Sequence, residues 1–234
     1  MQARRLLLWR HGRTAWNAER RFQGHSDVPL DSVGIAEAAA AAVLLSEEKP
    51  DLIVSSDLTR AMVTAQALAD VTGLPIRTDV RLRESSLGRW EGRTRADVER
   101  EFPGEWQQWV SGSLARRGGG ELHSEVADRA QAAAADADGQ TVVLVTHGGT
   151  AKLLAARLLG LPPPLSRVIA PLANCHWSDL RLEPAGWRLD RHNVGPFPEH
   201  EPVSSSVDAE EPEEAEEEIP VPPDAEAGVD RSGR

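Results

Sequence analysis

The chain of 234 residues contains one cysteine, no tyrosine and only 4% aromatic residues. With Cys175 alone, an internal disulfide is excluded, which suits the reducing cytoplasm where we expect the protein to reside. No apolar run approaches the length that crosses a membrane. The short run at 6–9 is interrupted by Arg10 and is too short for the core of a signal peptide. We therefore expect neither a membrane partner nor a leader.

Several signatures of ligand binding are also missing. The sequence has no zinc-type spacing of cysteine and histidine, no Walker loop, no internal repeat and no stripe of basic residues. No cluster of carboxylates suited to Mg²⁺ is evident. These absences argue against a nucleic-acid partner and against a nucleoside triphosphate as substrate. We expect no metal and no organic cofactor.

The net charge of −11 lies entirely in the C-terminal residues. Residues 196–234 contain 13 acidic residues, two arginines, seven prolines and one aromatic residue, whereas acidic and basic residues balance over 1–195. A segment so poor in apolar surface cannot offset the entropy that it loses on ordering. We expect a disordered acidic tail at 196–234, either without a specific role or serving as an interaction arm. The tail follows a single domain, 1–195, that is long enough to bury a core.

Short apolar runs alternate with helical patterns along 1–195. The runs have the length and punctuation of buried strands, which we expect at 4–9, 52–54, 76–78 and 141–145. Helices are expected over about 31–48, 58–71, 124–137 and 149–160, with one or two short helices between 83 and 120. The alternation at 175–182 and 186–192 is typical of a hairpin. This order predicts an α/β fold, a three-layer α/β/α sandwich around a mostly parallel central sheet.

Two of the predicted strands stop at a histidine that is followed by glycine. His11 and Gly12 come directly after the first strand, and His147 and Gly148 come after the fourth. In open α/β sheets, ligands bind outside the carboxyl ends of the strands. We therefore expect His11, His147 and the serines that follow the second strand, Ser55 and Ser56, to share one crevice.

The residues near these strand ends suit phosphoryl transfer. A neutral imidazole is a nucleophile near pH 7, and its attack on a phosphate monoester needs cations around the phosphoryl group. Arg10 and Arg60 supply fixed cations with planar forks, and the helix that begins after Gly148 offers N–H groups to an anion. Glu84, after the third strand, is the candidate acid for the leaving alkoxide and the base for water in a second step. It must hold a proton near neutral pH for the first task.

The segment at 10–17 matches the R-H-G-x-T-x-x-N motif of the histidine phosphatase superfamily, the phosphoglycerate-mutase-like enzymes. The similarity continues in order along the chain. Its further blocks lie at 23–24, 27–30, 34, 55–61, 82–84, 87–92, 119–121 and 147–149. The chain thus resembles this family over about 3–193, and the resemblance implies a phosphoglycerate-mutase-like fold.

The resemblance also implies roles for individual residues. His11 would be the phosphorylated nucleophile and Glu84 the proton donor. The phosphate would be held by Arg10, Arg60 and His147. The pocket would be completed by Asn17, Gln23, Gly24 and Gly148. The implied activity is that of a metal-independent phosphomonoesterase acting on a small phosphorylated metabolite, and a homodimer is plausible for this family.

Two alternatives remain open. A phosphoglycerate mutase of this family typically has a longer insertion and an E-R-x-Y-G-like string after the acid. Here Glu84 is followed by a different string at 85–92, and tyrosine is absent, which favours the phosphatase branch. Access of water to the phosphohistidine decides between hydrolysis and transfer. The other alternative, a binding module that has lost catalysis, is weakened because every catalytic position is filled.

Overall fold

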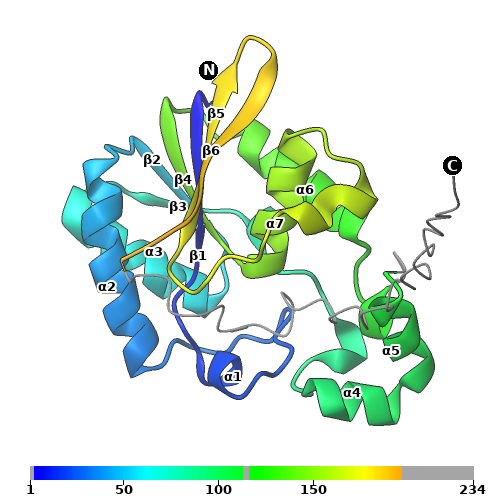
Figure 1. The fold of residues 1–234 in the computed structure, drawn as a ribbon. Coiled ribbons are helices and arrows are strands. Elements are labelled where there is room, and N and C mark those ends of the chain that lie inside the picture. Colours follow the sequence, from blue (N-terminus) through cyan, green and yellow to red (C-terminus); the bar gives the residue numbers. More distant parts are fainter. Residues whose placement is uncertain (1–2, 113–115, 197–234) are drawn as a thin grey trace, which may run out of the picture.

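The computed structural model describes residues 3–112 and 116–196, which contain one six-stranded sheet (Figure 1). Its strands are β1 (Arg5–Arg10), β2 (Leu52–Ser55), β3 (Ile76–Thr78), β4 (Thr141–Thr146), β5 (Trp177–Glu183) and β6 (Gly186–Val194). Their spatial order is β3-β2-β4-β1-β5-β6. The first four pair in parallel, and the hairpin of β5 and β6 extends the sheet in the antiparallel sense. The mostly parallel sheet is confirmed.

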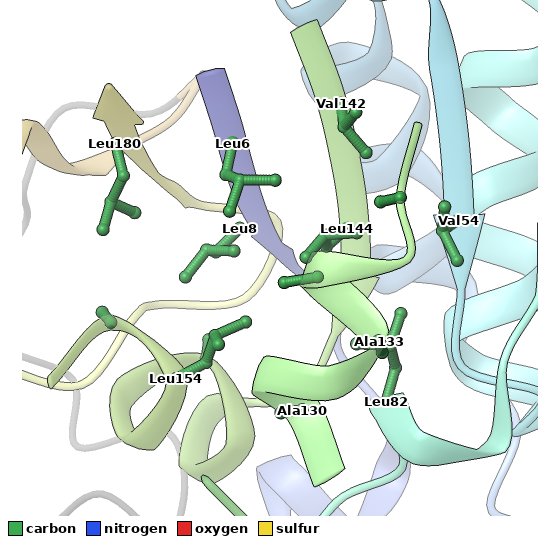
Figure 2. Close-up of a cluster of buried hydrophobic side chains, with 14 of the residues drawn as sticks. Leu6, Leu8, Val54, Leu82, Ala130, Ala133, Val142, Leu144, Leu154 and Leu180 are labelled. Carbon is green, nitrogen blue, oxygen red and sulfur yellow. The ribbon is translucent and has the colours of Figure 1, made fainter. Parts of the chain in front are cut away.

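Strand β1 is buried, and its side chains alternate between two apolar cores. The helices that cover the sheet are α2 (Ser32–Glu47), α3 (Thr59–Thr72), α6 (His123–Ala135) and α7 (Gly148–Leu158). Leu6 and Leu8 point toward α6 and α7, as Figure 2 shows, whereas Leu7 and Trp9 belong to the core beneath α2 and α3. Because successive side chains of a strand point to opposite faces, one continuous apolar run fills both cores. The three-layer α/β/α sandwich is therefore confirmed.

The four long helices begin and end within two residues of their predicted limits, for identifiable reasons. Helix α2 begins after Asp31, whose carboxylate accepts a hydrogen bond of 2.8 Å from the Gly34 N–H. Helix α3 ends at Gly73, which adopts the left-handed backbone conformation with φ of 73°. Both signals are local, so the sequence alone reveals them.

Between β3 and α6 the described residues form short helices, and there are more of them than the one or two predicted. They are η1 (Val80–Leu82), η2 (Gly88–Trp90), α4 (Arg95–Glu101), α5 (Pro103–Val110) and η3 (Arg117–Gly119). This segment shares a small core with the loop after the first strand, in which Trp90 packs against Phe22. Two further helices, α1 (Ala15–Ala18) and η4 (Pro163–Val168), are not predicted, because four to six residues are too few to show a helical period.

The acidic tail predicted to be disordered, 196–234, lies outside the described residues except for Pro196. Within the described ranges, no helix combines the length and the apolar character that crossing a membrane requires.

Candidate active site

The two histidines predicted at strand ends lie side by side. His11 directly follows β1 and His147 directly follows β4, and these neighbouring parallel strands end in register, with Arg10 opposite Thr146. The imidazole centroids are 5.1 Å apart, and the residues are only 3% and 0% exposed. Segments separated by more than 130 residues thus place two imidazoles in one buried site.

The hydrogen bonds of His11 fix its tautomer. Its Nδ1 lies 2.7 Å from the carbonyl oxygen of Gly12, which can only accept, so Nδ1 carries the proton and Nε2 keeps its lone pair. Burial lowers the pKa of His11 well below its ordinary value of 6.5, and the charges of Arg60 and Arg10 lower it further. His11 is therefore a neutral imidazole at pH 7, with Nε2 available as a nucleophile.

The buried guanidinium of Arg60 organises the opposite side of the site. Its Nη1 and Nη2 donate to the carbonyl oxygens of Ser26 and Gly24, each at 2.8 Å, and its Nε donates to Nδ1 of His147 at 3.2 Å. Because Nδ1 accepts, the His147 proton lies on Nε2, which is 2.9 Å from the hydroxyl of Ser56. Burial and the Arg60 charge lower the pKa of His147 well below 6.5, so this imidazole is also neutral. Gly24 contributes through its carbonyl, which anchors Arg60.

Arg10 is the last residue of β1 and brings a second cation to the site. It is almost fully buried, and its Nη1 donates to the carbonyl oxygen of Leu172 at 2.6 Å. Its guanidinium borders the start of α7, since a Cβ placed on Gly148 would lie 3.5 Å from Arg10 Nε. Cationic groups thus surround the two histidines. Among the residues that the structure describes, no three histidine, cysteine or acidic side chains are grouped so that they could hold a metal.

Glu84 lies at the N-terminus of α7. Its Oε1 accepts from the N–H groups of Ser85 and Thr150 at 2.8 and 3.0 Å and from the Thr150 hydroxyl at 3.1 Å, whereas Oε2 accepts from the Gly149 N–H at 3.0 Å. A Cβ on Gly149 would approach Oε1 to 2.7 Å, so any larger residue at this position would displace the Glu84 carboxylate. The sequence predicts that the N–H groups at the start of this helix bind phosphate. For those of Gly149 and Thr150 the prediction is wrong, because they donate to the Glu84 carboxylate instead.

Asn17 and Gln23 are buried around Thr14. The Thr14 hydroxyl caps α1 by accepting the Asn17 N–H at 3.1 Å, and the Asn17 Oδ1 accepts the Thr14 N–H at 3.1 Å. The Gln23 Oε1 lies 3.1 Å from the same hydroxyl. Asn174 joins this group to the nucleophile, since its Nδ2 donates to the His11 carbonyl at 3.0 Å. These polar side chains therefore brace the loop that follows His11.

The loop after His11 also requires a close backbone approach. A Cβ on Gly12 would lie 2.4 Å from the carbonyl oxygen of Gly34, at the start of α2. The Gly12 N–H donates to the Thr64 hydroxyl at 3.1 Å, and that hydroxyl donates in turn to the Arg60 carbonyl at 2.7 Å. Thr64 thus connects the nucleophile loop with the helix that carries Arg60.

The sequence analysis misses several residues of this site. Their positions in helices and loops carry no motif, and only the folded chain brings them to the predicted residues. They are Thr64, Arg129, Thr150 and Asn174.

The chain is similar to known proteins over most of its length. The family described as the histidine phosphatase superfamily (branch 1) matches residues 6–195. A glucosyl-3-phosphoglycerate phosphatase of Mycolicibacterium vanbaalenii is 42% identical over 217 residues, covering 83% of this chain and 96% of that protein. A probable phosphoglycerate mutase of Yersinia pestis is 37% identical over 187 residues, covering 78% and 86%.

Solved structures give the same result. The vanadate (VO3) complex of a mycobacterial glucosyl-3-phosphoglycerate phosphatase superposes with a TM-score of 0.77 at 39% identity, covering 82% of this chain and 100% of the other. The family match includes all six strands except the first residue of β1, and every residue named in the site above lies within it. The chain belongs to the histidine phosphatase superfamily.

Proposed function

We propose that this protein is a phosphomonoesterase that transfers the phosphoryl group of its substrate to His11 and then to water. The observation that carries the proposal is the neutral His11, whose Nε2 holds a lone pair beside Arg10, Arg60 and His147. Fixed positive charge at this position stabilises the charge that gathers on the phosphoryl oxygens in the transition state.

The first step forms a phosphorus–nitrogen bond and breaks the ester bond. The lone pair of His11 Nε2 attacks phosphorus, and the leaving alkoxide takes a proton from Glu84. Oε1 of Glu84 accepts three hydrogen bonds, whereas Oε2 accepts one among the residues that the structure describes. Oε2 is therefore the oxygen suited to carry the transferable proton.

The second step returns the enzyme to its starting state. Glu84, now a carboxylate, accepts a proton from water as the water oxygen attacks phosphorus. The phosphorus–nitrogen bond breaks, its electron pair returns to Nε2, and inorganic phosphate leaves. No proton on His11 changes place in this cycle, since Nδ1 donates to the Gly12 carbonyl throughout.

We propose glucosyl-3-phosphoglycerate as the substrate. The support is the identity of 38–42% with phosphatases of that name, which extends over 96% of their length. Transfer to a bound glycerate, as in a phosphoglycerate mutase, is the second candidate because of the Yersinia relative. The string after Glu84 and the absence of tyrosine favour hydrolysis.

The test is phosphate release, without added metal, from glucosyl-3-phosphoglycerate, 3-phosphoglycerate, α-ribazole phosphate and p-nitrophenyl phosphate. We expect one strongly preferred ester by kcat/KM, and an acid-labile phosphoenzyme after rapid quenching that His11→Ala abolishes. Phosphoryl exchange between glycerate positions that is faster than phosphate release would instead establish a mutase. Tight phosphate binding without turnover of any ester at about pH 5–8 would establish a binding module.

We further propose that 1–195 forms a cytoplasmic catalytic domain and that two copies associate. The support for a homodimer is the solvent-facing side of α2, where four apolar side chains are exposed. They are Val33, Ile35, Val43 and Leu44. Large apolar side chains exposed along one helix favour burial against a partner. Light scattering should give the mass of a dimer, and Ile35→Glu combined with Val43→Glu should give that of a monomer.

A further inference from the structure

The side chain of Arg129, in α6, reaches the backbone of Glu84 and of the residues just before it. Its Nη1 donates to the carbonyl oxygens of Arg81 and Arg83, each at 2.6 Å, and its Nη2 donates to the carbonyl oxygen of Glu84 at 2.9 Å. One guanidinium therefore binds three carbonyls within four consecutive residues. Binding three carbonyls at once in this way requires a planar group with several donors. Arginine has such a group and lysine does not.

Glu121 completes this arrangement from the other side. Its two carboxylate oxygens accept from Nε and Nη2 of Arg129, both at 2.9 Å, and its Oε2 also accepts the N–H of Ser86 at 2.8 Å. The Glu121 N–H donates to the Ser86 carbonyl at 2.9 Å. Burial by itself would raise the pKa of Glu121, but the bonds from Arg129 and Ser86 hold it below its ordinary value, so this carboxylate is ionised at neutral pH.

A third contact ties this segment to the phosphate side of the site. His25 Nε2 lies 2.8 Å from the Glu84 carbonyl oxygen and 3.7 Å from Glu121 Oε2. His25 belongs to the same loop as Gly24 and Ser26, whose carbonyls hold Arg60. The backbone of Glu84 is thus connected, through one loop, to the cation proposed to bind phosphate.

We propose that Arg129 and Glu121 are positioning residues that hold Glu84 in place to protonate the leaving group. This inference rests on the proposed function, because it assigns the pair to the acid step of that reaction. Arg129 does not contact the Glu84 carboxyl. It fixes the backbone from which that carboxyl projects, while the N-terminus of α7 fixes the carboxyl itself.

The backbone around Glu84 needs these positioning residues because of its local structure. The backbone at 79–91 has only the short helices η1 and η2, so the carbonyls around Glu84 have no regular helix or strand to hold them. Proton transfer demands that donor and acceptor approach within hydrogen-bond distance. A displacement of about 1 Å can lower a rate by about 10²-fold. Loss of Arg129 leaves three carbonyls and the Glu121 carboxylate without this partner, which permits such a displacement.

The test compares two esters that differ in their need for an acid. A sugar or glycerate phosphate expels a poor leaving group that must be protonated, whereas p-nitrophenolate leaves without a proton. For Arg129→Met we expect kcat/KM to fall on the order of 10²-fold with the alkyl ester and less than about threefold with p-nitrophenyl phosphate. Arg129→Lys should give an intermediate loss with the same pattern, and Glu121→Gln a smaller loss.

Arg157→Met is the matched control. Arg157 also pairs with a carboxylate on α6, Asp128, at 2.7 Å, but this bond does not involve the segment around Glu84. We expect Arg157→Met to leave kcat/KM for both esters within about threefold of the wild-type value, because an exposed ion pair contributes little. If Arg129→Met does not fold, Arg129→Lys and Glu121→Gln provide the same comparison, with thermal unfolding reporting that they are folded.

Equal losses for both esters, or no loss for either, would overturn the proposal. A second measurement tests the positioning role of Arg129 independently of the proposed function. Hydrogen exchange of the amides at 82–86 should accelerate in Arg129→Met, whereas exchange in α2 should not change. A wild-type protein without turnover would refute the proposed function, and the exchange rates would still decide whether Arg129 holds this segment.

Discussion

The two buried neutral histidines make folding sensitive to mild acid. His11 and His147 have pKa values well below 6.5, owing first to burial and then to the Arg60 charge. In the unfolded chain both pKa values return to about 6.5. Below that pH the unfolded state binds two protons that the folded state does not bind. The free energy of unfolding is therefore highest above the pKa of the unfolded state, and it decreases as the pH falls below that value.

The size of the loss follows from proton linkage. Between about pH 7.5 and about pH 5.5, each such histidine costs about 1.4 kcal/mol, so the pair costs about 2.7 kcal/mol. The pKa of His123 is also lowered, to about 3, and that of His192 is lowered, so both add to the loss with the same sign. For a domain of this size, a loss of about 2.7 kcal/mol corresponds to about 5–10 °C in Tm.

Urea unfolding at these two pH values measures the effect directly. We expect His11→Asn, which does not titrate, to reduce the loss on acidification by about 1.4 kcal/mol relative to the wild type. The substitution also changes the free energy of unfolding by an amount that does not depend on pH. This amount cancels, because only the difference in free energy between the two pH values is compared. A range of about pH 7.5–8.5, where few histidines titrate, serves as the control. The same loss in His11→Asn as in the wild type would show that His11 is not a buried neutral imidazole.

Three further outcomes are expected. Gly12→Ala should lower the free energy of unfolding by about 1–3 kcal/mol or more, because its Cβ would lie 2.4 Å from the Gly34 carbonyl oxygen. Thermal unfolding measures this change, and Gly104→Ala is the control, since a Cβ there would meet no atom within 4 Å. Glu84→Gln should reduce kcat/KM for an alkyl ester by about 10²–10⁴-fold and that for p-nitrophenyl phosphate far less; a uniform reduction would contradict its role as acid. Thr64→Val should cost about 1–3 kcal/mol in urea unfolding, since the Gly12 N–H loses its buried acceptor; an unchanged midpoint would argue against that bond.

Local patterns in the sequence determine the layers of the fold. The apolar runs, the Asp31 cap and the terminating Gly73 specify strands and helices through contacts within a few residues. The strand ends also determine where His11 and His147 lie, because parallel strands bring their carboxyl ends to one edge. Arg10, Arg60 and Glu84 are candidates by their chemistry near these strand ends and again by the family motif, and their roles remain predictions.

Tertiary structure decides how these groups are held and which state they adopt. The N–H groups at the start of α7 are directed to Glu84 rather than to an anion, because the packing of α7 against 83–85 brings that carboxylate within 3.0 Å of them. Likewise, Arg129 is one arginine among many in the sequence, and only the fold brings it to the Glu84 carbonyl. Burial, which sets the protonation of both histidines, exists only in the folded chain. The sequence therefore determines which chemical groups are present, and packing over long sequence separations determines their geometry and charge.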